Sequence, residues 1–229
     1  MAITSMALYG SRARNDHNAD SDTDLFAITD DERYQMVFHG MTNIACYPRE
    51  LALSRAAGGD LFFLHIVREA VVMYDHDSSF GEMQSAFKLK DSYHSDILKA
   101  AELGAALLQN IETFKNYFFI NKRLTWCLRT ILIALSAQQN NPVFSAKELA
   151  AMFGDKKIEL LLATKRELGY APAIYDEFKK RFSWYGGIKA EPLPQNLYVQ
   201  LNYFASKGNE MAVKTISTII NNMDDNDYT

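Results

Sequence analysis

The sequence predicts an α+β domain, with a mixed β-sheet and helices, over residues 1–90, followed by an all-α helical bundle over residues 91–229. Short β-rich runs between turn residues dominate the first part, whereas apolar residues recur at helical spacing in the second. The charge changes at the same place. Residues 1–90 carry eight Lys/Arg and 13 Asp/Glu, and residues 91–229 carry 16 and 15.

Five short runs in the first part have the composition of strands. They are Ile3–Tyr9, Asp24–Thr29, Tyr34–Phe38, Met41–Tyr47 and Val71–Tyr74. The third and fourth runs flank His39-Gly40, which predicts a hairpin. Two helices are expected before the last strand, one opened by Pro48 and one over residues 61–69, where apolar residues have helical spacing.

The second part predicts mainly long helices. One helix is expected over residues 94–119, and a more apolar one over residues 122–138, ended by Asn140-Asn141-Pro142. Ser145 and Glu148 have the spacing of a capping box, which predicts the start of another helix. Further helices are expected over residues 160–168, 172–182 and 197–222.

Composition excludes several classes of protein. The 229 residues are 48% apolar and carry a net charge of −4, which is typical of a packed domain and disfavours a dedicated duplex-binding protein. The two cysteines, Cys46 and Cys127, have no zinc-ligand spacing and are expected to be buried thiols in a reducing compartment. No apolar run approaches the roughly 18 residues of a membrane span, and the N-terminus lacks signal-peptide features, so a cytoplasmic location is expected.

A segment near the N-terminus has the composition of a phosphate-binding turn. The first strand leads into Gly10-Ser11, where glycine lets the backbone approach a ligand closely. Free N–H groups at the start of a turn attract anions, and the Ser11 hydroxyl can donate to a phosphate oxygen. Arg12 and Arg14 add positive charge nearby. These four residues are therefore candidates for holding phosphate groups.

Asp22 and Asp24 form a second candidate group, and ten residues separate Ser11 from Asp22. Because they are two positions apart at the start of a strand, their carboxylates are expected to lie on the same face. Mg²⁺ typically takes one or two carboxylates and completes its shell with water and substrate phosphates. The pair is therefore predicted to hold Mg²⁺, with Mn²⁺ as an alternative.

The combined segment resembles the signature of the DNA polymerase β-like nucleotidyltransferase superfamily in its minimal bacterial form, Gly-Ser-x-Ala-Arg-Gly-Asp followed by Ser-Asp-x-Asp-Leu. The matching positions are Gly10, Ser11, Ala13, Arg14, Asp16, Ser21, Asp22, Asp24 and Leu25. The resemblance covers residues 1–80. Asn15 replaces a glycine that is common in the family, a mild change because asparagine tolerates positive φ better than most residues.

The resemblance implies an Mg²⁺-dependent enzyme that transfers a nucleoside monophosphate from an NTP, expected to be ATP, to a hydroxyl and releases pyrophosphate. The acceptor would be a small molecule or a protein side chain, and an acidic chain disfavours a nucleic-acid acceptor. Asp22 and Asp24 would be the catalytic metal ligands. The residues that would bind the nucleotide are Gly10, Ser11, Arg12 and Arg14.

Asn43 departs from the family pattern. The family usually carries a third carboxylate on a later strand, and the order of strands places that position at Asn43. Asparagine cannot accept a proton as a base and is a weaker ligand for a hard cation. Either Glu69 or Asp75 substitutes, or the substrate completes the site, or catalysis is weak or absent. Asn43 therefore remains a candidate catalytic residue with an open role.

Two other functions remain open. Asn43 motivates a nucleotide-binding or partner-binding module, similar to an antitoxin, whose chemistry is weakened or lost. The strongly apolar residues 124–135 motivate a homo-oligomer formed through the helical part. In the enzyme interpretation, the helical part would instead cover the cleft and select the acceptor.

Overall fold

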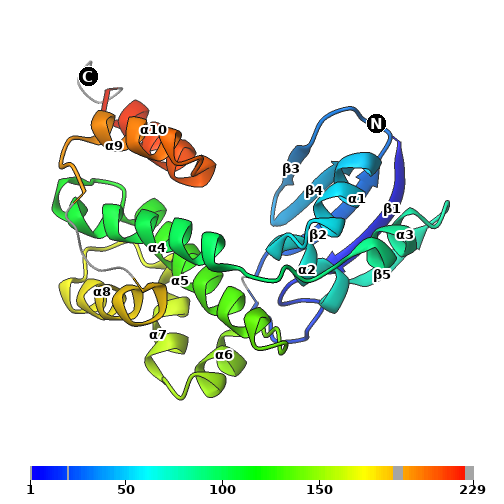
Figure 1. Ribbon diagram of the computed structural model, residues 1–229, viewed down its shortest axis with the longest axis horizontal. Helices are drawn as coiled ribbons and strands as arrows, with labels where there is room; N and C mark the ends of the chain where they lie inside the picture. Colours follow the sequence, from blue (N-terminus) through cyan, green and yellow to red (C-terminus); the bar gives the residue numbers. More distant parts are fainter. Residues whose placement is uncertain (1, 20, 188–192, 225–229) are drawn as a thin grey trace. The chain divides into compact units, whose positions relative to one another are not determined.

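The computed structural model describes residues 2–19, 21–187 and 193–224. The chain divides into two compact units, Met1–Asp91 and Ser92–Thr229, a division one residue from the predicted boundary. The first unit is a mixed sheet with helices and the second is helical (Figure 1). The predicted fold class is therefore confirmed.

Among the described residues, the sheet of the first unit has five strands in the order β3-β4-β2-β1-β5. Their bounds are β1 Ile3–Tyr9, β2 Thr23–Thr29, β3 Gln35–His39, β4 Thr42–Pro48 and β5 Val71–Asp75. Only β2 and β4 run parallel, and the other neighbouring pairs are antiparallel. The predicted hairpin joins β3 to β4 through Gly40, whose φ is +58°. This order places β2, the strand that carries Asp24, at the centre.

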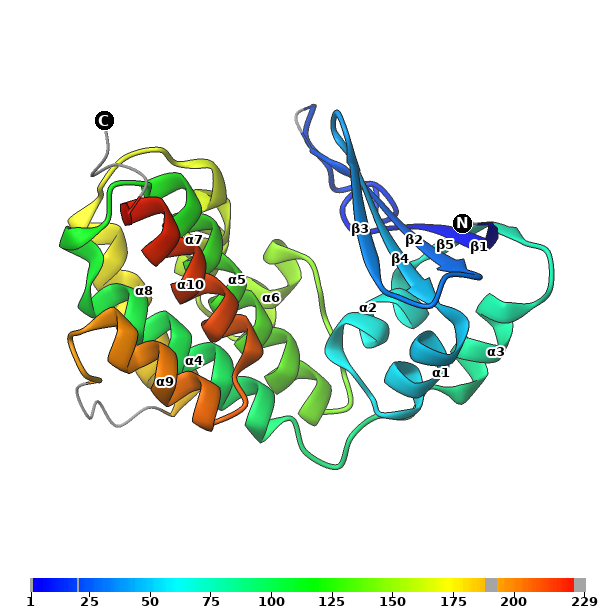
Figure 2. The ribbon, with the colours of Figure 1, turned by 90° about the horizontal axis from the view of Figure 1, so that it is seen from above.

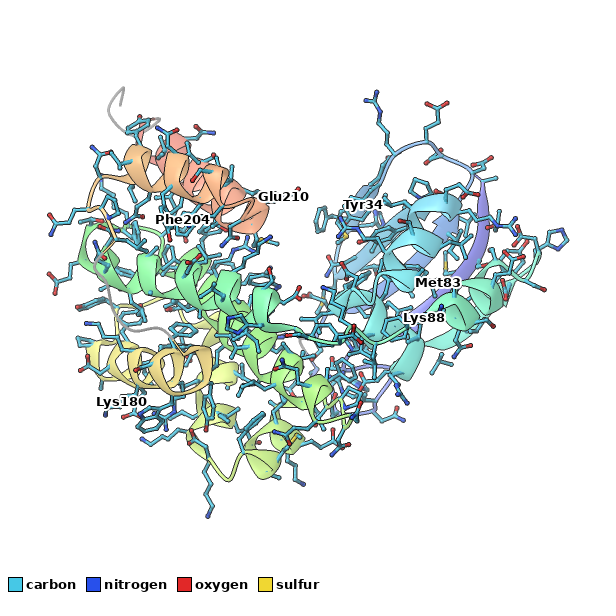
Figure 3. All side chains as sticks on the ribbon, in the orientation of Figure 1. Tyr34, Met83, Lys88, Lys180, Phe204 and Glu210 are labelled. Atoms are coloured by element: carbon cyan, nitrogen blue, oxygen red, sulfur yellow. The ribbon has the colours of Figure 1, made fainter. Side chains whose placement is uncertain are left out.

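Three helices cover one face of the sheet, as Figure 2 shows. They are α1 Arg49–Ala57, α2 Leu61–Glu69 and α3 Ser79–Ala86. Alternate residues of β2, Phe26 and Ile28, are fully buried against them, together with Phe63 of α2 and Met83 of α3, which Figure 3 labels. The period-2 alternation of β2 thus directs one set of side chains to the helices.

Helix α3 is absent from the sequence prediction, which expects no helix between the run Val71–Tyr74 and residue 94. A polar turn over residues 75–78 precedes this helix. Two carboxylates of that turn start the helix. Asp75 accepts hydrogen bonds from the N–H groups of Phe80 and Gly81 at 3.1 and 3.3 Å, and Asp77 accepts one from Ser79. The turn residues are therefore helix caps, which satisfy N–H groups that have no partner within the helix.

The second unit contains seven α-helices and two short 3₁₀ helices among its described residues. They are α4 His94–Gln109, η1 Ile111–Thr113, α5 Tyr117–Gln138, α6 Ala146–Met152, α7 Lys157–Ala163, η2 Thr164–Arg166, α8 Pro172–Gly186, α9 Leu197–Ser206 and α10 Glu210–Asp224. The predicted capping box is present, because the Ser145 hydroxyl accepts from the N–H of Glu148 at 3.2 Å. None of the helices in the described part of the chain combines the length and apolarity needed to cross a membrane.

The single helix predicted over residues 94–119 is wrong. It breaks at Asn110, whose side chain donates to the carbonyl of Ala106, and η1 follows. Asn116 then starts α5 by accepting a hydrogen bond from the N–H of Phe119 at 3.0 Å. Asparagine competes with the helical backbone in this way, so apolar spacing on both sides of it does not guarantee one helix.

The helix predicted over residues 197–222 is likewise two helices. Gly208 has a φ of +60° and ends α9, and the Asn209 side chain accepts from the N–H of Ala212 at the start of α10. Asn209 also donates to the carbonyl of Lys99, which attaches the turn to α4.

Close approaches fix the packing of α8 against α4. A Cβ on Gly104 would lie 2.6 Å from the ring of Phe182, and one on Gly186 would lie 2.5 Å from the Cβ of Ala101. Helix α5 packs beside them with Leu124, Leu128 and four neighbouring apolar residues fully buried. Packing within the unit therefore accounts for the apolarity of residues 124–135.

Candidate functional site

Four residues form a row across the sheet at one end of β2. Strand pairing places Tyr9 opposite Asp24, Asp24 opposite Asn43, and Asn43 opposite Phe38. Directly opposed residues point to the same face of a sheet. The Nδ2 atom of Asn43 donates to Oδ1 of Asp24 at 3.0 Å. Asn43 therefore lies against Asp24, at the place the sequence predicts.

The row lies on the face that carries α2. The Tyr9 ring packs edge-on against the rings of Phe62 and His65 at centroid distances of 5.5 and 5.6 Å. Burial, together with the nearby charge of Asp24, raises the pKa of the Tyr9 hydroxyl. Tyr9 therefore stays neutral in the physiological range and forms one wall of the site.

Gly10 brings the backbone turn into contact with Asp24. It has a φ of +76°, and a Cβ at this position would lie 3.2 Å from Oδ2 of Asp24. The N–H of Arg14 donates to the carbonyl of Gly10 at 3.1 Å, which closes one helix-like turn. The N–H groups of Ser11, Arg12 and Ala13 have no acceptor among the described residues. Such a set of unpaired N–H groups is suited to an anion.

Asn15, at a position where the family commonly has glycine, has a left-handed backbone conformation. Its φ is +60°, and the flanking N–H of Asp16 donates to the carbonyl of Ser11 at 3.0 Å. The left-handed region is tolerated by asparagine at a modest cost. The turn therefore closes with asparagine at this position.

The two arginines of the turn have different partners. The guanidinium of Arg12 donates through Nε and Nη2 to the carbonyl of Ser21, at 3.2 and 2.8 Å, and so ties the turn to the start of β2. Arg14 instead pairs with Asp16 at 3.0 Å and with Glu69 of α2 at 2.6 Å. Arg14 thus lies beside the turn with its charge already balanced by carboxylates.

Glu69 joins Arg14 to His65. One oxygen of Glu69 lies 2.6 Å from Nη1 of Arg14 and 2.8 Å from Nε2 of His65. Burial alone would raise the pKa of Glu69, but the hydrogen bonds from His65 and Arg14 outweigh it, so the pKa falls below its ordinary value. Burial also opposes the charge of Arg14, yet its bonds to Asp16 and Glu69 raise its pKa overall. Both groups are therefore charged at neutral pH.

Residues 1–79 match the family model described as polymerase beta, nucleotidyltransferase. The N-terminal unit belongs to the polymerase β-like nucleotidyltransferase superfamily. The match ends within the first unit and does not extend into the helical unit. No curated protein matches the chain.

The nucleotidyltransferase unit offers two carboxylates and one amide for a metal. Asp22 is exposed just before β2 and has no hydrogen-bond or ion-pair partner among the described residues, and Asp24 is next to Asn43. The described residues contain no group of three His, Cys, Asp or Glu side chains that could hold a metal. Two carboxylates fit one Mg²⁺ that completes its shell with water and phosphate, but they do not make a three-carboxylate site.

Neither acid considered as a substitute for Asn43 replaces the missing carboxylate in the row. Asp75 is opposite Ser5 on β1 and accepts its hydroxyl hydrogen bond at 2.5 Å. Ser5 is four residues from Tyr9, or roughly 13 Å along the strand. Asp75 therefore belongs to the other end of the sheet and to the cap of α3. Glu69 contacts Arg14 and His65 on the α2 side.

The sequence did not indicate Tyr9 or Phe38 as residues of the site. The side chain of Phe38 is 72% exposed at the end of the row, beside Asn43. Tyr34, labelled in Figure 3, and Met36 precede it at alternate positions and are also exposed. The sequence does contain a pattern that could have indicated Phe38. Apolar residues alternate along the edge strand that pairs with the strand of Asn43, and such an alternation places an apolar stripe beside the site.

Proposed function

We propose that the protein is an Mg²⁺-dependent nucleotidyltransferase that moves a nucleoside monophosphate from an NTP, with ATP as the first choice, to a hydroxyl of a small molecule or protein. One observation carries the proposal. Gly10 brings a turn, three of whose N–H groups have no acceptor in the described part of the chain, against the carboxylate of Asp24. A phosphate group on that turn would lie beside a carboxylate that can share a cation with it.

Each residue of the turn has a role in this proposal. The N–H groups of Ser11, Arg12 and Ala13 donate to triphosphate oxygens, and the Ser11 hydroxyl, which has no partner among the described residues, adds a further donor. Arg12 holds the turn against the start of β2. Asp22 and Asp24 would hold the Mg²⁺, or Mn²⁺, which when bound neutralises the charge of the phosphates.

Arg14 has to exchange partners to bind the nucleotide. Its charge is shared between Asp16 and Glu69, so a phosphate must replace at least one carboxylate. Such an exchange keeps the guanidinium in a charge-assisted hydrogen bond throughout. It also releases Glu69 toward His65, to which it is already bonded at 2.8 Å.

The acceptor hydroxyl would enter on the side of Asn43 and Phe38, because the phosphate turn occupies the opposite side of Asp24. Asn43 can hold this hydroxyl by a hydrogen bond but cannot take its proton. The exposed ring of Phe38 gives the acceptor an apolar surface beside the site. We place the reaction in the cytoplasm, and we assign selection of the acceptor or homo-oligomerisation to the helical unit.

A second function is supported by Asn43 itself. With an amide at the third position and no three-residue acidic group among the described residues, the unit can bind an NTP without efficient transfer. The protein would then be a nucleotide-binding or partner-binding module, similar to an antitoxin. The two functions share the nucleotide site and differ only in turnover.

Isothermal titration with each NTP, with and without Mg²⁺, tests the shared site. We expect binding that requires Mg²⁺ and that the double variant Asp22→Asn/Asp24→Asn loses. Glu50→Gln is the matched control, because it removes an exposed carboxylate on α1 away from the row. No binding by the wild type, or equal binding by the double variant, would contradict both functions.

Pyrophosphate release then separates the two functions. The titrated protein is incubated with Mg²⁺, the NTP it binds and a panel of hydroxyl acceptors that includes proteins. Release that depends on an acceptor and is lost in Asp24→Asn supports the transferase. Tight NTP binding without release from any acceptor favours the binding module.

A further inference from the structure

Arg123 of the helical unit has no acidic partner among the described residues. Phe119, Arg123 and Trp126 follow one another on the same face of α5, at spacings of four and three residues. The guanidinium carbon of Arg123 lies 5.4 Å from the centroid of the Phe119 ring and 6.0 Å from that of Trp126. Met211 of α10 approaches from another helix, with its sulfur 3.1 Å from Nη1.

The other half-buried or buried arginines of the unit have oxygen acceptors. Arg181 pairs with Asp155 and Glu177, and Arg129 donates to the carbonyl of Phe144 at 2.6 Å. Arg123 has neither kind of partner among the described residues. Burial accordingly lowers the pKa of Arg123, whereas the carboxylates beside Arg181 outweigh its burial and raise its pKa.

The unpaired atoms of Arg123 form one edge of its guanidinium. Nε is buried and has no hydrogen-bond partner, and Nη2 has none among the described residues, whereas Nη1 is the atom that contacts Met211. Nε and Nη2 together are a pair of parallel donors that matches the two oxygens of a carboxylate or phosphate. The geometry therefore leaves this bidentate edge, beside two aromatic rings, without an oxygen acceptor among the described residues.

Packing alone does not explain this arrangement. The aromatic faces interact favourably with the cation. However, they do not supply an oxygen to the N–H of Nε, and a buried donor without an acceptor is costly. An apolar side chain of similar length would fill the same space without that cost. An arginine at this position is explained if an oxyanion accepts the hydrogen bond of Nε in the functional state.

We propose that Arg123, Phe119, Trp126 and Met211 form a binding site for an oxyanion, a phosphate or carboxylate group, carried by a ligand whose remaining part packs against the two rings. The anion accepts the hydrogen bonds of Nε and Nη2. All four residues of this site belong to the helical unit, so the proposal does not depend on the proposed transferase activity.

Tryptophan fluorescence gives a direct test, because Trp126 is part of the site. The chain has two tryptophans, and Trp184→Phe leaves Trp126 as the reporter. In this background, the probes are inorganic phosphate, pyrophosphate, acetate and benzoate, each titrated at constant ionic strength. We expect a saturable change in fluorescence with at least one probe. Phosphate and carboxylate probes distinguish the two sources of the anion, and benzoate tests the contribution of the rings.

Two variants and a charge control make the test specific. Arg123→Lys keeps the charge but loses the bidentate edge, and Arg123→Met fills the space with an apolar chain. We expect each to weaken binding at least about tenfold, the scale of a lost charge-assisted hydrogen bond. Lys122→Met, which removes an exposed neighbouring charge, should bind the probe as the parent does.

Thermal denaturation separates a ligand site from a structural role. If the unpaired arginine serves a ligand, Arg123→Met should melt at the same temperature as the parent or higher without probe. A marked loss of stability in Arg123→Met would assign Arg123 to packing and overturn the proposal. So would the absence of a saturable response to every probe, or a response that Arg123→Lys keeps unchanged.

Discussion

The contact between Asn43 and Asp24 allows a test of whether position 43 faces a metal ion. Asn43→Asp would place two carboxylates about 3.0 Å apart, where their repulsion disfavours full ionisation of both. Without metal, we expect the variant to lose about 1–2 kcal/mol of unfolding free energy at neutral pH. With Mg²⁺, the added carboxylate should raise metal affinity and recover that loss.

Thermal denaturation with and without Mg²⁺ measures both effects. Asn43→Leu is the control, since it removes the same hydrogen bond without adding a charge. A variant Asn43→Asp whose melting temperature responds to Mg²⁺ no more than that of Asn43→Leu would show that position 43 does not face a metal. A gain in pyrophosphate release would support the transferase directly.

The ion pair of Glu69 predicts a dependence of stability on pH. Its pKa is lowered in the folded protein by His65 and Arg14, so its contribution is full above the pKa of the unfolded chain and is lost as pH falls through the folded pKa. At pH 7, Glu69→Gln should cost about 1–3 kcal/mol. Chemical denaturation from pH 7 to about pH 3 should show this difference shrinking. A difference independent of pH would refute the ionic account.

The sequence predicts which of these residues belong to the site, but it predicts their contacts less well. Gly10 and Asp24 belong to one pattern of residue types, and Asn43 follows from the order of strands. The contacts of Arg14 with Glu69 and His65 could not be predicted, because these two residues reach it from a helix more than 50 residues away. Strand pairing and helix placement, rather than local composition, decide whether an arginine in the turn is free or paired.

Among the elements, α3 depends on a cap that lies outside it. Asp75 of β5 accepts from Ser5 of β1 and from two N–H groups at the start of α3, so one carboxylate joins two strands and a helix. Asp75→Ala should destabilise the N-terminal unit by about 1–3 kcal/mol. NTP binding should stay unchanged at temperatures where the variant is folded, as titration can measure. A loss of binding with intact stability would instead return Asp75 to the site.

The differences between predicted and observed elements have a common cause. The strands and α2 follow from apolar patterns, which burial on one face enforces. Helix α3 and the breaks at Asn110 and Gly208 depend on hydrogen bonds of polar side chains and on one positive φ. A periodic pattern cannot report these features, because asparagine and aspartate are equally suited to exposed helix faces, caps and turns.

At the scale of the molecule, the two units have separate interiors. The core of the first is formed by the sheet and α1–α3, and that of the second by α4, α5 and α8. Domains with their own cores can unfold in separate transitions, so a single melting temperature does not describe them. Because of this separation, the unit that binds a ligand can be identified from the unfolding transition whose temperature the ligand raises.

Calorimetry of the full chain with Mg²⁺ and ATP can show which of the two unfolding transitions responds to the nucleotide. Because a ligand stabilises the unit that binds it, about 2.7 kcal/mol at 100 times its Kd, we expect one transition to rise while the other stays in place. The double variant Asp22→Asn/Asp24→Asn should abolish this rise, and Arg123→Met should not affect it. If Mg²⁺ and ATP moved both transitions together, the units would be energetically coupled. Ligand binding at the sheet would then be communicated to the helical unit.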